Sequence, residues 1–168
     1  HTKIETLIHN FTKKWFWFFV FSQYIPSDSG MGVLYLQEFI PSNEADLRIT
    51  VIGDKYAYGF WRNNRPGDFR ASGSGRIDYD REIPLDAVRY CQKINKFLHF
   101  DSMAYDILFN KGQMVINEMS YSYVDSALYN TRGYYKFDPD IQYVEGHVWP
   151  QELWVHVLFE KLGLKNNA

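Results

Sequence analysis

Apolar residues concentrate in two pairs of short segments, and a turn signal separates the members of each pair. The signals are Gly53-Asp54 in the first pair and Lys111-Gly112 in the second. Short apolar segments on both sides of such a turn are typical of β-hairpins. With one further apolar run before them, the predicted strands are 33–40, 47–52, 56–61, 103–109 and 114–120.

Helical spacing of apolar residues predicts three helices, at residues 1–12, from about Pro84 to Leu98, and from about Pro150 onward. The second should bury Leu85, Val88, Cys91, Ile94 and Phe97 or Leu98. The third should bury Leu153, Trp154, Val157, Leu158 and Leu162. Residues 26–32, 63–82 and the Tyr-rich stretch 121–148 are expected to be largely irregular. The order predicts an α+β fold, an antiparallel sheet with flanking helices on one side.

The composition argues against some classes of partner and location but does not indicate a function. The 168 residues carry a net charge of −2, which argues against nucleic acid or an anionic membrane as the main partner. The apolar run from Trp15 to Phe21 is too short for a membrane span and lacks a signal-peptide cleavage site. A single cysteine, Cys91, cannot form an internal disulfide. We therefore expect a cytoplasmic protein without a membrane span; its oligomeric state stays open.

Two carboxylates interrupt the apolar strands of the second hairpin. Asp106 and Glu118 fall opposite each other if the hairpin has a three-residue loop, and a two-residue loop would instead pair Asp106 with Asn117. In the first register the pair would suit Mg²⁺, and Ser120 would share the face of Glu118. The alternative is two separate acids on a solvated face, and the spacing alone leaves both interpretations open.

Five arginines fall close together, interleaved with acids and glycines: Arg48, Arg62, Arg65, Arg70 and Arg76. Arginines beside glycine-rich backbone suit phosphate or carboxylate groups. A solvated loop with internal ion pairs is the commoner outcome. The sequence Gly73-Ser74-Gly75 is not a P-loop, since no Gly-Lys-Ser/Thr follows it.

Three stretches together resemble the C-terminal part of ATP-grasp carboxylate–amine ligases, over about residues 33–155. The first holds Leu36 to Pro41, Asp46-Leu47-Arg48 and Val51 to Lys55. The second holds Trp61-Arg62 and Gly67 to Gly75. The third pairs Tyr105-Asp106-Ile107 with Ile116 to Tyr121. The set is similar to glutathione-synthetase-like and ribosomal-protein glutamate ligase sequences. It is closer to a bacterial branch linked with cell-envelope and capsule-polysaccharide genes, as is the stretch Glu145 to Gln151.

The resemblance implies a role for each matching residue. Gln37, Glu38, Phe39 and Ile40 would form the adenine hinge, with Asp46 and Arg48 beside the ribose and phosphates. Arg62 and Arg70 would be catalytic, on the γ-phosphate or acyl-phosphate and on the acceptor. Asp106, Glu118 and Ser120 would hold Mg²⁺, or Mn²⁺ in its place. Ser120 departs from the family, where Asn is usual.

The implied activity is ligation of small-molecule carboxylates and amines with ATP, through an acyl-phosphate, to give an amide. Residues 1–32 would be a remnant of the preceding subdomain and 33–168 the C-terminal subdomain. The family's phosphate-binding lysine and glycine-rich loop are not recognised before residue 33, so we expect an incomplete, inactive fragment. The alternative is a non-catalytic nucleotide- or partner-binding protein with the same fold. A glycoside hydrolase using Asp106 and Glu118 is a third, less favoured hypothesis.

Overall fold

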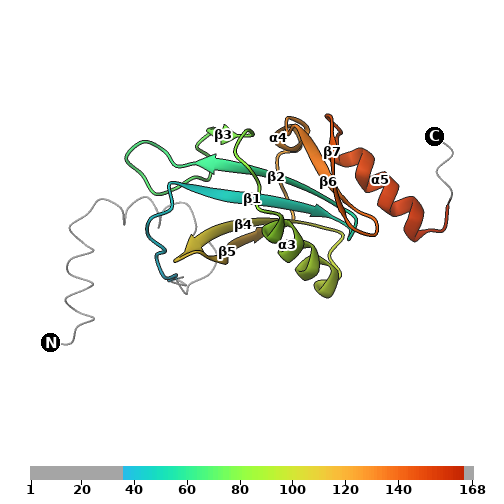
Figure 1. Ribbon diagram of the computed structural model, residues 1–168, viewed down its shortest axis with the longest axis horizontal. Helices are drawn as coiled ribbons and strands as arrows, with labels where there is room; N and C mark the ends of the chain where they lie inside the picture. The colour runs from blue at the N-terminus through green and yellow to red at the C-terminus, as the bar shows by residue number, and fades with distance from the viewer. Residues whose placement is uncertain (1–35, 165–168) are drawn as a thin grey trace, which may run out of the picture. The chain divides into compact units, whose positions relative to one another are not determined.

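Two antiparallel hairpins form the centre of the fold, as the apolar segments and turn residues predict. A computed structural model describes residues 36–164, and the chain divides into compact units His1–Phe39 and Ile40–Ala168. All the helices and strands described here belong to the second unit (Figure 1). They are β1 (Ala45–Ile52), β2 (Tyr56–Asn63), β3 (Ile77–Asp78), α3 (Leu85–Leu98), β4 (Ser102–Asn110), β5 (Gln113–Ser120), α4 (Asp125–Tyr129), β6 (Gly133–Phe137), β7 (Ile141–Glu145) and α5 (Pro150–Lys161).

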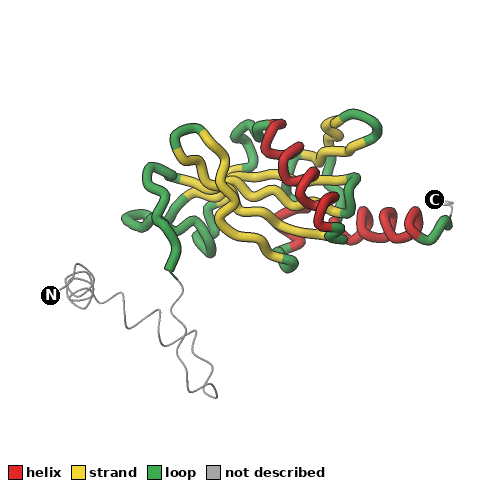
Figure 2. Tube along the Cα trace, turned by 90° about the horizontal axis from the view of Figure 1, so that it is seen from below, coloured by secondary structure: helices red, strands yellow, loops and turns green. Residues whose placement is uncertain are grey.

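The seven strands form one antiparallel sheet in the order β5-β4-β1-β2-β6-β7, with β3 paired to β2. This is an α+β fold, as expected. The expectation that the helices lie on one side is wrong: α3 covers one face, while α4 and α5 pack on the other. The two views agree, since α3 lies across the strands in Figure 2 and α4 lies on the opposite side.

The alternation along β1 explains the two layers. Leu47, Ile49 and Val51 are fully buried on one face, where they contact Ala87, Val88 and Cys91 of α3. Ile52 belongs to the other face, with Tyr56, Tyr58 and Phe60 of β2, Leu128 of α4, and Leu153 and Val157 of α5. At about 25 cal/mol per Å² of apolar surface, these two clusters supply most of the driving force for folding.

The turn between β1 and β2 depends on a glycine. Gly53 has φ +60°, and a Cβ there would lie 2.8 Å from the side chain of Val157. Glycine therefore serves both the left-handed backbone and the close approach of α5.

Several predicted segments differ from the structure. Of the predicted strand 33–40, residues 36–40 have no regular secondary structure, and residues 33–35 lie outside the described residues. The helix at 1–12 and the loop at 26–32 lie outside the described residues. The loop 63–82 contains β3, and 121–148 contains α4, β6 and β7. The clustered tyrosines give this stretch little apolar–polar alternation. The pairing of β6 with β2 is also short, from Tyr56↔Lys136 to Ala57↔Tyr135.

Both helices bury only part of the predicted stripe. In α3, Val88 and Cys91 are buried as predicted and Ile94 packs against the same core. Leu85, Phe97 and Leu98 are exposed, and Ala87 and Asn95 are buried in addition. In α5, Leu153 and Val157 are buried as predicted, whereas Trp154, Leu158 and Leu162 are exposed. Figure 1 shows the reason for α5: the helix continues past the end of the sheet, so its outer face meets no strand. Within residues 36–164 no helix combines the length and apolar character that crossing a bilayer requires.

The buried polar residue in α3, Asn95, fastens the helix to the sheet. Its Nδ2 donates to the carbonyl oxygens of Gly53 and Phe100, and its Oδ1 accepts from the hydroxyl of Tyr105 at 3.1 Å. Because these groups are buried or half-buried, losing the amide would leave them without partners. Each buried polar group left without a hydrogen bond lowers the free energy of unfolding by about 1–3 kcal/mol.

We therefore expect Asn95→Ala to lower the free energy of unfolding by about 3 kcal/mol or more. Tyr105→Phe is the matched control, since it removes one of the three hydrogen bonds and should cost about 1 kcal/mol. Urea unfolding followed by circular dichroism measures both. Equal losses in the two variants would contradict this role for Asn95.

Candidate functional site

Four charged residues gather on one face of the three central strands, and the register brings them together. Asp46 of β1 lies opposite Arg62 of β2, and Arg48 of β1 lies opposite Asp106 of β4. Residues 46 and 48 share a face because strand side chains alternate. We call these four residues, Asp46, Arg48, Arg62 and Asp106, the charged network.

The network is a continuous chain of short ion pairs. Arg62 donates from Nε and Nη2 to the two carboxylate oxygens of Asp46, at 2.8 and 2.5 Å. The same Nη2 lies 2.6 Å from Oδ2 of Asp106. Arg48 binds Asp106 from the other side. Its Nε donates to Oδ1 and its Nη2 donates to Oδ2, both at 2.7 Å. Asp106 is thus shared by two guanidinium groups.

Burial makes these contacts energetically important. The residues Asp46 and Arg62 are each 7% exposed and Asp106 is 3% exposed. Burial raises the pKa of Asp46 above its ordinary value, and the hydrogen bond from Arg62 limits that rise. Burial also disfavours the charged form of Arg62, but its bond to Asp46 and the charge of Asp106 raise its pKa overall. The guanidinium therefore stays charged and holds both carboxylates.

Glu118 lies opposite Asp106, as predicted, but through a different loop. The turn has only two residues, Lys111 and Gly112, whose φ values of 51° and 80° fit a type I′ turn. That turn pairs Ile107 with Ile116, and a β-bulge at Asn117 then shifts the register by one residue, so that Asp106 pairs with Glu118. The prediction that a two-residue loop would pair Asp106 with Asn117 is wrong, because it did not allow for the bulge.

The donor set at this point fits Mg²⁺ only in part. Asp106 and Glu118 supply carboxylate oxygens from facing positions, which is the ligand type that Mg²⁺ prefers. The Ser120 hydroxyl instead donates to the carbonyl of Ser122 at 2.8 Å. Two guanidiniums at Asp106 repel a lone divalent cation. No group of three or more acidic, His or Cys side chains suited to a metal occurs within residues 36–164. The set therefore fits a cation that arrives with phosphate.

The other predicted residues lie apart from the network. Arg70 is in the exposed loop between β2 and β3, where its Nη2 contacts Asp68 at 2.6 Å and holds the pKa of that carboxyl down to about 2. In the same loop Arg65 donates to Ser72 and Arg76 to Asn64. The loop thus has the internal pairing that the sequence left as an alternative. Only Arg48 and Arg62 of the five arginines belong to strands.

The predicted hinge divides between the two compact units. Gln37, Glu38 and Phe39 belong to the first, in an exposed segment without regular secondary structure. Ile40 opens the second unit, and Asn43 then ties the chain to β4 by donating to the carbonyl of Phe109 at 3.1 Å and accepting from its N–H at 2.9 Å. Their roles at a nucleotide stay predictions.

Sequence reasoning named every member of the charged network but missed that they pair with one another. The available signal was the β1–β2 hairpin: if Ile52 pairs with Tyr56, then Asp46 must pair with Arg62. The partner of Arg48 needed the long-range pairing of β1 with β4, which the order of elements does not specify.

Replacing Asp106 by Asn should lower the free energy of unfolding by about 3–5 kcal/mol, because it leaves the buried guanidinium of Arg62 and the half-buried one of Arg48 short of a counter-charge. Glu118→Gln, on the exposed edge strand directly opposite, should change it by less than about 0.5 kcal/mol. Urea unfolding at neutral pH measures both. If both variants unfold at the same urea concentration as the parent, the network does not stabilise the sheet.

Comparisons of the chain with protein-family models and with curated proteins find no match.

Proposed function

We propose that the second unit is the C-terminal part of an ATP-grasp carboxylate–amine ligase and binds nucleotide phosphates on the face of the charged network. The observation that carries the proposal is the buried network itself. It joins Asp46, Arg48, Arg62 and Asp106 into one cluster, with Glu118 across the hairpin. These are the residues to which the sequence resemblance gives nucleotide and metal roles.

The orientation of the arginines supports an anion site. Arg48 and Arg62 both use the Nε–Nη2 edge for their carboxylates. Within the described part of the chain, neither Nη1 group has a hydrogen bond, so each remains available to donate. Carboxylates that fix a guanidinium in this way reduce the entropy lost when it binds phosphate. Asp46 is thus a positioning residue for Arg62.

The same residues suggest how ligation would proceed. The γ-phosphoryl group of ATP moves to a carboxylate oxygen and ADP leaves; an amine then attacks the acyl carbon, loses a proton and expels phosphate. Arg62 would offset the negative charge that develops on the transferring phosphoryl oxygens. Asp106 and Glu118 would hold Mg²⁺, which would supply positive charge to offset that of the phosphates.

A non-catalytic nucleotide- or partner-binding protein is the second candidate. It is favoured by the engagement of Asp106 with two arginines and by the hydroxyl of Ser120, which is directed to Ser122 rather than to Glu118. ADP release during incubation of the full chain with ATP, Mg²⁺ and mixed carboxylates and amines separates the two. Nucleotide binding without ADP release would support the second candidate.

The nucleotide proposal is tested by titrating the full chain with ADP in a calorimeter. Arg48→Met should weaken ADP binding about tenfold or more, since one charge-assisted hydrogen bond contributes about 1.5–3 kcal/mol. Asp46→Asn should weaken it by less, because the guanidinium of Arg62 remains but is less well oriented. The matched control is Arg76→Met in the exposed loop, which should leave the affinity unchanged. Equal affinity in the parent and the Arg48 variant, with both folded, would overturn the proposal.

Metal binding should depend on the nucleotide. Mn²⁺ alone should bind weakly, because Arg48 and Arg62 occupy Asp106, and the protein–ADP complex should bind it about tenfold more tightly than the free protein. Glu118→Gln should remove most of that gain. Electron paramagnetic resonance measures free Mn²⁺ directly, with ADP–Mn²⁺ in buffer as the reference. Tight Mn²⁺ binding without ADP would contradict the account of the two guanidiniums.

A further inference from the structure

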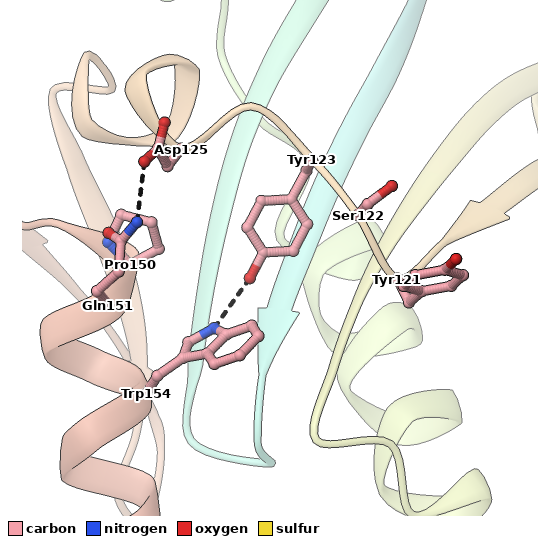
Figure 3. Close-up of a pocket in the computed structure, with 7 residues that line it drawn as sticks. All are labelled: Tyr121, Ser122, Tyr123, Asp125, Pro150, Gln151 and Trp154. Atoms are coloured by element: carbon pink, nitrogen blue, oxygen red, sulfur yellow. Dashed lines mark hydrogen bonds between the residues drawn. The ribbon is translucent and has the colours of Figure 1, made fainter.

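A second candidate site, lined by polar and aromatic side chains, lies where the chain passes from β5 to α4. A cavity of about 300 Å³ there faces the first turns of α5. Figure 3 shows its lining: Tyr121, Ser122, Tyr123, Asp125, Pro150, Gln151 and Trp154. These residues come from two segments of the chain, residues 121–125 and the start of α5. We call the site the aromatic pocket.

One wall of the aromatic pocket is a pair of rings fixed by their own polar atoms. Nε1 of Trp154 donates to the hydroxyl of Tyr123 at 2.9 Å, as Figure 3 shows, and that hydroxyl also bonds Oγ of Ser102 at 2.7 Å. Burial raises the pKa of Tyr123, so the phenol stays neutral at physiological pH. With their heteroatoms occupied, the two rings offer mainly carbon surface to a ligand. Tyr121, 82% exposed, adds a third ring at the open side.

The charge in the aromatic pocket comes from one oriented carboxylate. Oδ2 of Asp125 accepts from Nε2 of Gln151 at 2.9 Å, and its Oδ1 accepts from the backbone N–H of Ser126 at 2.7 Å. Each oxygen retains a second lone pair. None of the seven lining residues is Lys or Arg. An anionic ligand would therefore meet an uncompensated negative charge.

Ring faces beside a carboxylate, with no basic group, match the chemistry that recognises organic cations. A cation over an aromatic face gains about 0.5–2 kcal/mol, and a carboxylate adds a charge-assisted hydrogen bond. We propose that the aromatic pocket binds an organic ammonium group, with Asp125 as its counter-ion and the rings of Trp154 and Tyr123 as its wall. The site needs neither nucleotide nor metal.

Its position relative to the charged network is set by β4. Ser102, which bonds Tyr123, lies on the same sheet face as Asp106, four residues along the strand. At about 3.3 Å per residue the separation is about 13 Å. The aromatic pocket, bordered by Tyr123, therefore lies on the sheet face that carries the charged network.

The test is a titration of the full chain followed by NMR of the Trp154 indole N–H, whose resonance is assigned by its loss in Trp154→Phe. The probes are butylammonium, 1-butanol and butyrate, which share a chain length and differ in charge. Butylammonium should give a saturable shift, and the two others should bind about fivefold or more weakly. Equal binding of butanol and butylammonium would mean a simple apolar cleft and would overturn the proposal.

Substitutions of the lining residues test which side chains contribute to butylammonium binding. Asp125→Asn keeps the size of the side chain and one acceptor oxygen but removes its charge, and should weaken butylammonium binding about fivefold or more. Tyr121→Leu, on an exposed ring, tests the aromatic contribution without risk to the core and should weaken it about twofold or more. The matched controls are Asp86→Asn and Tyr90→Leu, exposed residues of α3, which should leave the affinity within about twofold of the parent. Unchanged affinity in Asp125→Asn would also overturn the proposal.

Discussion

The fold depends on satisfying buried charge at the centre of its sheet. Asp106 lies in the middle of an otherwise apolar strand, and an isolated carboxylate there would be too costly to keep ionised. Arg48 and Arg62 compensate it from the neighbouring strands, and Asp46 in turn compensates Arg62. Because the four side chains come from β1, β2 and β4, the network requires one register across all three strands. A one-residue slip would separate every pair and leave four charges without partners. The network thus contributes specificity of pairing as well as energy.

The parts of the fold that sequence analysis predicted are those with strong local signals. Both central hairpins, α3 and the start of α5 follow from apolar segments, helical spacing and turn residues. The β6–β7 hairpin was missed because most of its side chains are exposed or only partly buried, which blurs the apolar pattern. The side of the sheet that each helix covers depends on tertiary packing and not on local pattern. Asn95 shows the same limit, since its burial is explained by partners on β4 and on the β1–β2 turn.

The candidate site divides in the same way. The residue types were identified correctly, because carboxylates and arginines inside apolar strands are conspicuous. Their partnerships were not, since the partner of Arg48 lies 58 positions away and is fixed by the sheet alone. The aromatic pocket also depends on tertiary structure, since Tyr121 and Trp154 are separated along the chain by the whole β6–β7 hairpin. Tyr123 packs against the core while also lining the cavity.

The bulge at Asn117 has a consequence for how this hairpin tolerates change in length. An odd number of residues separates Asp106 from Glu118, and a tight two-residue turn leaves one of them over. The structure accommodates that surplus residue in β5, directly beside Glu118. A three-residue tip with a straight ladder would accommodate it equally well without moving either carboxylate. Insertions and deletions at the two places can therefore cancel, so related chains with different hairpin tips can still present the same two acids face to face.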